Sequence, residues 1–278
     1  MVLKTFYNKK MINKALSFFS IILFLFTSQL LYSQDTVENT AFKAGEYLKY
    51  RVYYSSAILN ATAGEAILTV SNWEEKQKGE NKEFYRITGL GNSKGMFNWF
   101  YKVEDKFESF VDINTLLPYA FVRKTHEGKY IQNDLVIFDR KDDKAIVNSA
   151  DTFNIPQNVH DFVSALYFMR TLDVKDFNAD SLFFVNFFLD DSVYMSAVKY
   201  EGKVDIKTKW GKITCLKIAP MMASGEVFSD SYPMHVYVSD DKNHVPIMAE
   251  SKIVVGSVKM ELIEYGGLMS TLKVKIKD

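Results

Sequence analysis

The feature that most constrains this chain is a long succession of short alternating segments, interrupted once by a stretch with helical spacing. In residues 47–54, for example, Leu48, Tyr50, Val52 and Tyr54 fall on one face and the intervening residues on the other. Alternation of this kind, rich in aromatic and β-branched residues, is typical of a half-buried β-strand. Such segments recur about every ten residues, which is the spacing of antiparallel sandwiches and barrels. The sequence therefore predicts an all-β, mainly antiparallel fold, either a large sandwich or a partly open β-barrel meander.

The pattern predicts strands on both sides of the helical stretch. The segments before it are residues 45–54, 63–70, 83–90, 103–112, 117–126, 130–139 and 145–148. Those after it are residues 181–189, 192–200, 203–209, 213–218, 234–238, 245–255, 258–265 and 270–276. Polar or glycine-containing segments between them predict turns and loops, notably at residues 72–82, 140–144, 190–191 and 201–202. Residues 181–189 are apolar at nearly every position, which predicts a strand covered on both faces.

The helical stretch runs from Pro156 to Arg170, and we expect a helix over residues 157–171. Its apolar residues make a single stripe, formed by Val159, Phe162, Val163, Leu166 and Tyr167. Pro156, Asn158 and Asp161 suit a helix start, and Arg170 suits a last turn. A helix of about twelve residues is not stable alone, so it should pack on the sheet, near residues 182–189.

The pair His160 and Asp161 within this stretch resembles a catalytic dyad only in sequence. Neighbouring side chains on a helix point about 100 degrees apart and do not face each other. We therefore interpret the pair as the start of the helix, with Asp161 near the positive end of the helix dipole.

A second aromatic group follows the glycine-rich residues 89–95. This segment lacks the Gly-Lys-Ser/Thr ending of a phosphate-binding loop, so we interpret it as a turn. Residues 96–101, with Phe97 and Trp99, form either part of the core or an exposed rim, and large exposed apolar patches are uncommon. The core interpretation is therefore favoured.

The first 33 residues have the order of a secretory signal peptide. Lys9, Lys10 and Lys14 precede an apolar run over residues 15–26, and small and polar residues follow, with cleavage expected after Ser33. The alternative is an uncleaved anchor, but the apolar run is shorter than the roughly 20 residues that a membrane span needs. No cysteine lies near the cleavage site to accept a lipid. We therefore expect a soluble protein exported to the periplasm, with no transmembrane span after cleavage.

Residues 34–278 then remain for the fold, and no Pro- or Ser-rich linker divides them. We expect a single mainly-β domain, with two half-like regions at 42–150 and 178–276 around the helix, although two smaller domains would also fit this length. After cleavage 30 basic and 34 acidic residues give a net charge of −4, so nucleic-acid binding is not expected. The single cysteine, Cys215, excludes an internal disulfide and suits a small buried side chain in a strand.

The motifs that usually carry chemistry are absent from the sequence. The four histidines, at 126, 160, 235 and 244, are never three or four residues apart, and no cysteine pair accompanies them. We expect no metal site and no cofactor. There is no Gly-x-Ser-x-Gly elbow. Asp and Glu are plentiful, so an acid–base pair of a glycosidase remains an alternative, but the sequence singles out no two of them and no catalytic residue.

Four groups of residues resemble a known family. They are Gly45-Glu46-Tyr47-Leu48-Lys49-Tyr50 with Ala63-Gly64-Glu65-Ala66; residues 160–170; Val236-Tyr237-Val238-Ser239-Asp240-Asp241 with Val245-Pro246-Ile247; and residues 253–257 followed by Leu262. Their order and spacing, over roughly Phe42 to Tyr265, are similar to the bacterial domain-of-unknown-function family numbered 3108. The resemblance implies an exported, mostly β protein of the cell envelope. It implies no activity and no catalytic residues.

Three functions stay open at this level. The first is a non-catalytic envelope protein that binds a lipid or the tail of a glycolipid in a cavity of the barrel or sandwich. The second is a hydrolase of envelope polysaccharide, and the third is a structural or assembly partner of another envelope protein. For the first, we expect the ligand under the helix, and the candidate ligand-binding residues are Phe162, Leu166, Met169, Trp99 and Phe97.

Overall fold

The computed structural model describes residues 36–57, 60–77, 80–174, 177–221, 232–253 and 256–275. Two helices are described, α2 (Phe97–Phe100) and α3 (Phe162–Met169). The strands before α3 are β1 (Tyr47–Ser55), β2 (Asn60–Gln77), β3 (Glu80–Ser93), β4 (Glu104–Asp112), β5 (Pro118–Glu127), β6 (Tyr130–Asp139), β7 (Lys144–Val147) and β8 (Asp151–Asn154). Those after it are β9 (Leu182–Leu189), β10 (Ser192–Thr208), β11 (Gly211–Pro220), β12 (Met234–Ser239), β13 (Pro246–Lys252) and β14 (Ser257–Gly266).

All fourteen described strands belong to one antiparallel sheet. Strands β1 to β8 follow one another across one half, and β9 to β14 follow one another across the other half. The halves join where β1 pairs with β14, from Tyr47 opposite Gly266 to Ser55 opposite Ser257. The sheet therefore ends at β8 on one side and at β9 on the other, and α3 lies between these two strands in the sequence.

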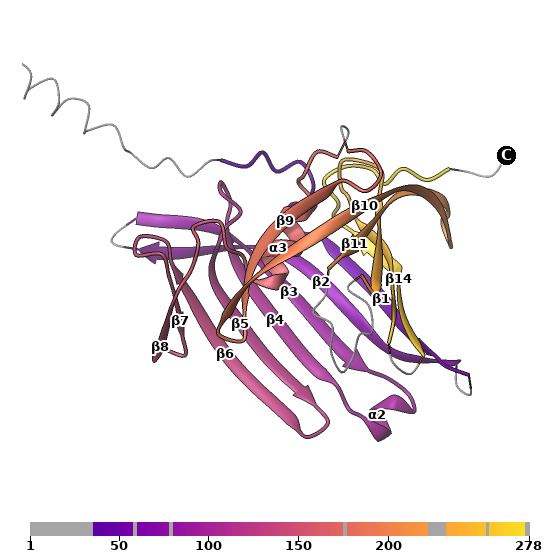
Figure 1. The fold of residues 1–278 in the computed structure, drawn as a ribbon, viewed down its shortest axis with the longest axis horizontal. Helices are drawn as coiled ribbons and strands as arrows, with labels where there is room; N and C mark the ends of the chain where they lie inside the picture. The colour runs from indigo at the N-terminus through magenta and orange to yellow at the C-terminus, as the bar shows by residue number, and fades with distance from the viewer. Residues whose placement is uncertain are drawn as a thin grey trace, which may run out of the picture. The chain divides into compact units, whose positions relative to one another are not determined.

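The sheet bends around α3. The helix contacts β3 and β4 in one half and β9 at the far end of the other half. Strands so far apart in the order of the sheet can touch one short helix only if the sheet curls about it. Figure 1 shows α3 within this bend, beside β9 and in front of the strands of the first half. The fold is thus a partly open barrel with a helix inside, and the sandwich alternative is wrong because there are not two facing sheets.

The two ends of the sheet approach each other without pairing. The Phe188 ring on β9 lies 5.7 Å from the Phe153 ring on β8, measured between centroids. The segment before α3 runs along β9 instead: the His160 N–H donates to the Asn186 carbonyl at 2.9 Å, and the Phe188 N–H donates to the His160 carbonyl at 2.7 Å. This short parallel bridge occupies the position of the missing strand pair.

The same bridge corrects the predicted start of the helix. The helix begins at Phe162, with Asp161 as its N-cap and Arg170 as its C-cap, and not at residue 157. Pro156 to His160 are extended or turned because the His160 backbone is bonded to β9. Val159, predicted on the helical stripe, therefore precedes the helix, although it is fully buried.

Several predicted strands and turns also differ from the structure. Within the predicted loop at 72–82, residues 72–77 and 80–82 are strand, because β2 and β3 form a long hairpin that pairs as far as Gln77 opposite Glu80. Residues 89–93 continue β3, so the glycine-rich turn comes later, at Gly95. The predicted turn at 201–202 is a bulge inside the continuous β10. Strand β8 was missed, and residues 270–276 contribute only one described bridge, between Lys275 and Lys212.

The predicted turn at Asp190 and Asp191 is confirmed, and both residues have positive φ angles of 46° and 59°. Two such residues make the tight hairpin turn whose twist suits antiparallel strands.

Strand β9 is only partly as predicted. Its residues Val185 and Phe188 are buried, but Leu182 is 49% exposed and Phe184 is 57% exposed. The prediction of cover on both faces is wrong for this end of the strand, because β9 is an edge strand and the described segment before α3 reaches only as far as Asn186.

The interior has two main apolar clusters. The first lies between the first half of the sheet and α3, and it includes Phe42, Ile87, Phe121, Val163 and Tyr167. The second lies where β1 meets the strands of the second half, and it includes Leu48, Tyr50, Ile213, Ile247 and the buried thiol of Cys215. Burial raises the pKa of that thiol to about 12, which suits the predicted inert core residue.

The predicted signal peptide at residues 1–33 lies outside the described residues. Within the described parts of the chain, neither helix has the length and apolar content that crossing a bilayer requires.

Candidate functional site

A cavity with a volume of about 480 Å³ lies between α3 and the second half of the sheet. Its wall is almost entirely apolar and comes from α3, from the strands β9 to β12 and from the segments next to them. The lining residues are Phe162, Ala165, Leu166, Met169, Arg170, Val174, Phe183, Val185, Phe187, Leu189, Ser196, Val198, Leu216, Ile218, Pro220, Met221, Met234, Val236, Val238 and His244. Met221 is 40% exposed, so the cavity reaches the surface beside it.

The periodicities of the elements explain this wall. On β9 every second residue, from Phe183 to Leu189, faces the cavity, as expected for a pleated strand. On α3 the cavity-facing residues Phe162, Leu166 and Met169 are three or four positions apart, so they share one side of the helix. The adjacent side, about 100° around the helix, carries Val163 and Tyr167, which belong to the filled cluster against the first half of the sheet.

Among the described residues of the wall, three have polar side chains, and each is hydrogen-bonded. Arg170 is engaged by a buried carboxylate and two carbonyls. The Ser196 hydroxyl donates to the Met221 carbonyl at 3.2 Å. His244 Nδ1 lies 2.7 Å from the Arg170 carbonyl oxygen. The described residues of the wall therefore present no unpaired charge.

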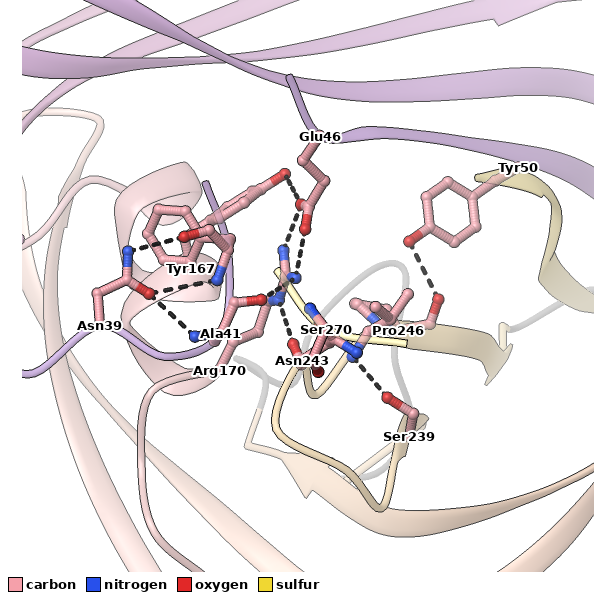
Figure 2. Close-up of polar contacts among 12 residues, drawn as sticks. Asn39, Ala41, Glu46, Tyr50, Tyr167, Arg170, Ser239, Asn243, Pro246 and Ser270 are labelled. Atoms are coloured by element: carbon pink, nitrogen blue, oxygen red, sulfur yellow. Dashed lines mark hydrogen bonds and ion pairs between the residues drawn. The ribbon is translucent and has the colours of Figure 1, made fainter. Parts of the chain in front are cut away.

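Arg170 is the centre of a buried polar network (Figure 2). Its Nη1 and Nη2 atoms donate to the two carboxylate oxygens of Glu46, each at 2.7 Å, and both side chains are almost completely buried. Its Nε donates to the Asn243 carbonyl at 3.1 Å, and Nη2 also donates to the Ala41 carbonyl at 3.2 Å. The Tyr167 hydroxyl donates to Glu46 at 3.1 Å. Buried charges need this degree of pairing, because an isolated one costs several kcal/mol.

The loop that supplies Asn243 and His244 is held by Asp241. This buried carboxylate accepts from the Ser239 hydroxyl at 3.0 Å, from the Asn243 N–H at 2.9 Å and from the Lys273 N–H at 3.0 Å. The Ser270 N–H also donates to the Asn243 side chain at 2.8 Å. The loop is therefore fixed on two sides before it contacts the end of α3.

The start of α3 is a second buried polar group. The carboxylate of Asp161 accepts from the N–H groups of Val163 and Ser164 at 2.8 and 2.9 Å, and from the Ser109 hydroxyl at 2.6 Å. The Ser164 hydroxyl oxygen accepts from the Asp161 N–H, which completes a capping box. Burial raises the pKa of Asp161 to about 6, although these hydrogen bonds act in the opposite direction.

His160 stacks on Phe168, with 4.7 Å between ring centroids, and contacts Ser164. Burial, helped by the charge of Arg140, lowers its pKa to about 3. His160 is thus a neutral ring in the core at neutral pH, and the interpretation of the His160–Asp161 pair as a helix start agrees with the observed N-cap.

The structure divides the predicted ligand-binding residues into two groups. Phe162, Leu166 and Met169 lie together in the wall of the cavity beside α3. Phe162 also packs on Phe107 and Phe121, with centroids 4.8 and 5.4 Å away. Phe97 and Trp99 lie on α2, at the connection of β3 to β4 at the lower end of the view in Figure 1, and do not line this cavity.

The favoured core interpretation of residues 96–101 is wrong for most of its large side chains. Trp99 is 86% exposed, and Met96 and Tyr101 are about half exposed. Phe97 packs on Tyr54, with the centroids 5.6 Å apart. The segment is a short helical connection beyond the ends of the neighbouring strands, so no second layer of the fold covers it.

Sequence reasoning missed most of the wall, namely the residues of β9 to β12 and His244. Alternation did mark one face of each strand as apolar, but it did not show which faces meet. It also missed the pairing of Glu46 with Arg170, because the two residues are 124 positions apart in the sequence.

Among the described residues, carboxyl groups lie near one another in at least three places, which bears on the hydrolase alternative. One is a cavity of about 410 Å³ whose wall includes Glu74, Glu83 and Asp112. The other two places hold closer pairs. In a smaller cavity of about 200 Å³, Asp134 and Asp190 both accept from Nη2 of Arg123, at 2.5 and 2.6 Å. The second pair is Glu127 and Asp105, where burial and the neighbouring Asp105 raise the pKa of Glu127. In the first pair the carboxylates are bound to the same guanidinium, and in the second they are bonded to each other. Neither pair leaves room for a substrate between two free carboxyl groups.

A single curled antiparallel sheet with a helix in its bend defines a class of barrel-like β proteins. A solved structure has a similar fold: the crystal structure of a β-barrel-like protein of the domain of unknown function DUF1849 from Brucella abortus. The two chains are 13% identical, with a TM-score of 0.52, and the match covers 82% of this chain and 99% of the other. At this identity the likeness concerns the fold alone.

The chain belongs to the family described as "Protein of unknown function (DUF3108)", whose model matches residues 49–263. The resemblance seen in the sequence is therefore confirmed. No curated protein matches the chain.

Three of the sequence segments that carry this resemblance meet in the structure. The first contains Glu46, the second ends at Arg170, and the third leads into the loop of Asp241 and Asn243. These residues meet in one buried network beside the cavity (Figure 2).

Proposed function

We propose that this protein is a non-catalytic, exported envelope protein that binds one apolar or amphipathic ligand, a lipid or the tail of a glycolipid, in the cavity beneath α3. The observation that carries the proposal is the cavity itself, about 480 Å³ with an almost wholly apolar wall. This volume falls within the range of roughly 300–1,000 Å³ that is usual for small-molecule sites.

The energetic cost of such a space supports an occupant. Measured cavity terms of about 24 cal/mol per Å³ imply that an enclosed, empty void of this volume would cost on the order of 10 kcal/mol. That is comparable to the whole free energy of unfolding of an ordinary domain. Contact with solvent beside Met221 reduces the cost, but an apolar wall gains little from water. An apolar ligand in the cavity would gain the free energy of removing its own surface and that of the wall from water, which the protein does not gain while the cavity is empty.

The chemistry of the wall favours binding over catalysis. A general acid or base must be within hydrogen-bond reach of its substrate and free to exchange a proton. The carboxylate nearest the cavity wall in the described network, Glu46, is buried and held by Arg170. The wall thus offers shape and apolar contact, which suit a carrier or a receptor.

Native mass spectrometry of the protein purified from the periplasm tests the proposal directly. We expect a co-purifying apolar molecule, or uptake of a lipid after delipidation. Displacement of diphenylhexatriene, a neutral hydrocarbon dye that brightens in apolar surroundings, gives an affinity. Leu166→Trp fills the cavity and should abolish dye uptake while the protein stays folded.

The matched control is Ile131→Trp, which adds an indole at an exposed position of β6 away from the cavity. We expect it to bind dye as the unaltered chain does. A clean apo mass together with no dye uptake by the unaltered protein would overturn the proposal. Equal uptake by Leu166→Trp would place the dye elsewhere and overturn the assignment of the site.

A further inference from the structure

We propose that His244 is the polar anchor of this cavity, and that the preferred ligand is an uncharged long-chain molecule with a hydroxyl or amide N–H donor. The inference rests on the proposed function and adds the class of ligand to it. It depends on which ring nitrogen of His244 carries the hydrogen, and on the hydrogen bonds that the other described polar side chains of the wall already make.

The hydrogen bond of His244 fixes which ring nitrogen faces a ligand as an acceptor. Its Nδ1 lies 2.7 Å from the carbonyl oxygen of Arg170. A carbonyl can only accept, so Nδ1 must carry the hydrogen. In the neutral ring Nε2 then has a free lone pair and accepts hydrogen bonds. Within the described residues, no hydrogen bond engages Nε2, and the half-buried ring belongs to the cavity wall.

The backbone around His244 holds the ring in this position. His244 has a φ angle of 42°, a conformation that is uncommon outside glycine, although asparagine, aspartate and histidine adopt it more often than other residues. Hydrogen bonds of Asp241 and Asn243 hold this backbone conformation, because they tie the loop to residues 270–273. An orientation held by several bonds is a property of a preorganised site.

The other described polar side chains of the wall offer a ligand no free donor. The Ser196 hydroxyl already donates to a carbonyl, so it too can only accept from a ligand. Four hydrogen bonds engage the guanidinium of Arg170, whose charge is balanced by Glu46. The described part of the wall therefore offers acceptors and no free positive charge. A carboxylate or phosphate inside the cavity would lose its hydration without gaining a counter-charge.

A donor on the ligand should therefore improve binding, and an anionic group should weaken it. A hydrogen bond between neutral groups contributes enough to change affinity by about tenfold. A ligand of equal length without the donor leaves Nε2 unpaired in an apolar site, and this is the difference to be measured.

The experiment compares three ligands with the same chain length on the intact protein, by displacement of diphenylhexatriene. Tetradecanol has the donor, methyl tetradecyl ether keeps the oxygen but lacks the donor, and tetradecanoate is charged. We expect tetradecanol to bind about tenfold more tightly than the ether. Tetradecanoate should be the weakest.

The variant His244→Asn removes Nε2 while an amide can still donate to the Arg170 carbonyl, and asparagine tolerates the positive φ angle. We expect the alcohol and the ether to bind it equally. His126→Asn, on β5 outside the cavity, is the matched control and should keep the tenfold preference.

The outcomes separate the two proposals. Equal affinity of the unaltered protein for the alcohol and the ether, or tighter binding of tetradecanoate, overturns the role of His244 and leaves the cavity as a binding site. No displacement by any of the three would count against the proposed function itself. The comparison of ligands on the unaltered protein decides the question even if His244→Asn does not fold.

Discussion

The two sides of α3 show opposite solutions to the same packing problem. Toward the first half of the sheet, Val163 and Tyr167 are fully packed, and Tyr167 reaches the buried Glu46–Arg170 pair. Toward the second half, Leu166 and Met169 face a cavity of about 480 Å³. One eight-residue helix thus has a filled side and a hollow side.

The difference shows that the apolar character of a helix face does not decide whether the space beside it is filled. Both sides are apolar, and both face antiparallel strands of the same sheet. The first half of the sheet receives aromatic side chains and the segment around Phe42, which fill the space. On the other side the lining strands β9 to β12 contribute mostly aliphatic side chains, and the space stays open. A binding site can therefore arise beside a well-packed core.

The largest expected effect is on the filled side, at the buried ion pair. Glu46→Ala leaves the Arg170 charge uncompensated in the core, and we expect the free energy of unfolding to fall by about 3–5 kcal/mol. Urea unfolding followed by circular dichroism measures it. Adding Arg170→Met should recover part of the loss, since no charge then remains buried. Glu264→Ala, at an exposed position of β14, is the control and should have almost no effect. A loss at Glu46 as small as at Glu264 would contradict the role of the network.

A second test of the filled side uses pH. The pKa of Asp161 is raised to about 6 in the folded protein, so between about pH 6 and pH 4 the folded state keeps a proton that the unfolded chain releases. Taken by itself, Asp161 raises the free energy of unfolding as the pH falls through that window. His160, whose pKa is lowered to about 3, acts in the opposite direction, because the unfolded chain binds its proton first. In the unaltered protein the two contributions partly cancel.

Asp161→Asn keeps a good N-cap but removes one of the two contributions. Relative to the unaltered protein, the variant should lose up to about 3 kcal/mol between pH 6 and pH 4. Urea unfolding at several pH values would show the two stability curves diverging on acidification. Parallel curves would mean that Asp161 does not hold a proton in this range.

The most direct test of the two sides introduces the same side chain on each. Val163→Phe forces a ring into the filled cluster, and we expect a loss of about 1–3 kcal/mol. Leu166→Phe enlarges a side chain that faces free space, so its effect on the free energy of unfolding should be well below that of Val163→Phe. Thermal unfolding of the two variants compares them. Equal losses would mean that the cavity is not available to a larger side chain.

The smallest effect is expected away from both sides, at α2. Trp99 is 86% exposed, so Trp99→Ala should change the free energy of unfolding by no more than about 0.5 kcal/mol. Trp73→Ala is the matched comparison and should cost more, because the Trp73 ring packs on Phe110 with the centroids 4.6 Å apart. The same chemical denaturation measures both. A large loss at Trp99 would show that the segment contributes to the core after all.

The sequence predicted much of the local structure of this protein. The alternation of residues in β1, β4, β5, β6 and β12 located those strands, and Asp190 and Asp191 marked a turn that the structure contains. The stripe of Phe162, Leu166 and Met169 located the helix face that lines the cavity. These signals are local, because strand and helix periodicities are written in neighbouring residues.

The errors came where contacts between distant residues overruled local patterns. His160 looks like part of a helix, but its backbone pairs with β9. Residues 72–77 look like a loop, yet pairing along the β2–β3 hairpin makes them strand. Phe184 looks buried, although its place near the free edge of the sheet exposes it. Asn243 and His244 have no pattern around them that reveals a contact with Arg170.

The sequence by itself determined the all-β class, the position of one helix and which face of each strand is apolar, because hydrophobic periodicity depends only on nearby residues. Only the tertiary structure decided that the sheet curls around α3 without closing, that Glu46 reaches Arg170, and that one side of α3 is filled while the other is hollow. The physical reason is that the closure of a sheet and the filling of a space depend on side chains brought together from far apart in the chain, whose combined volumes are set only when the strands meet.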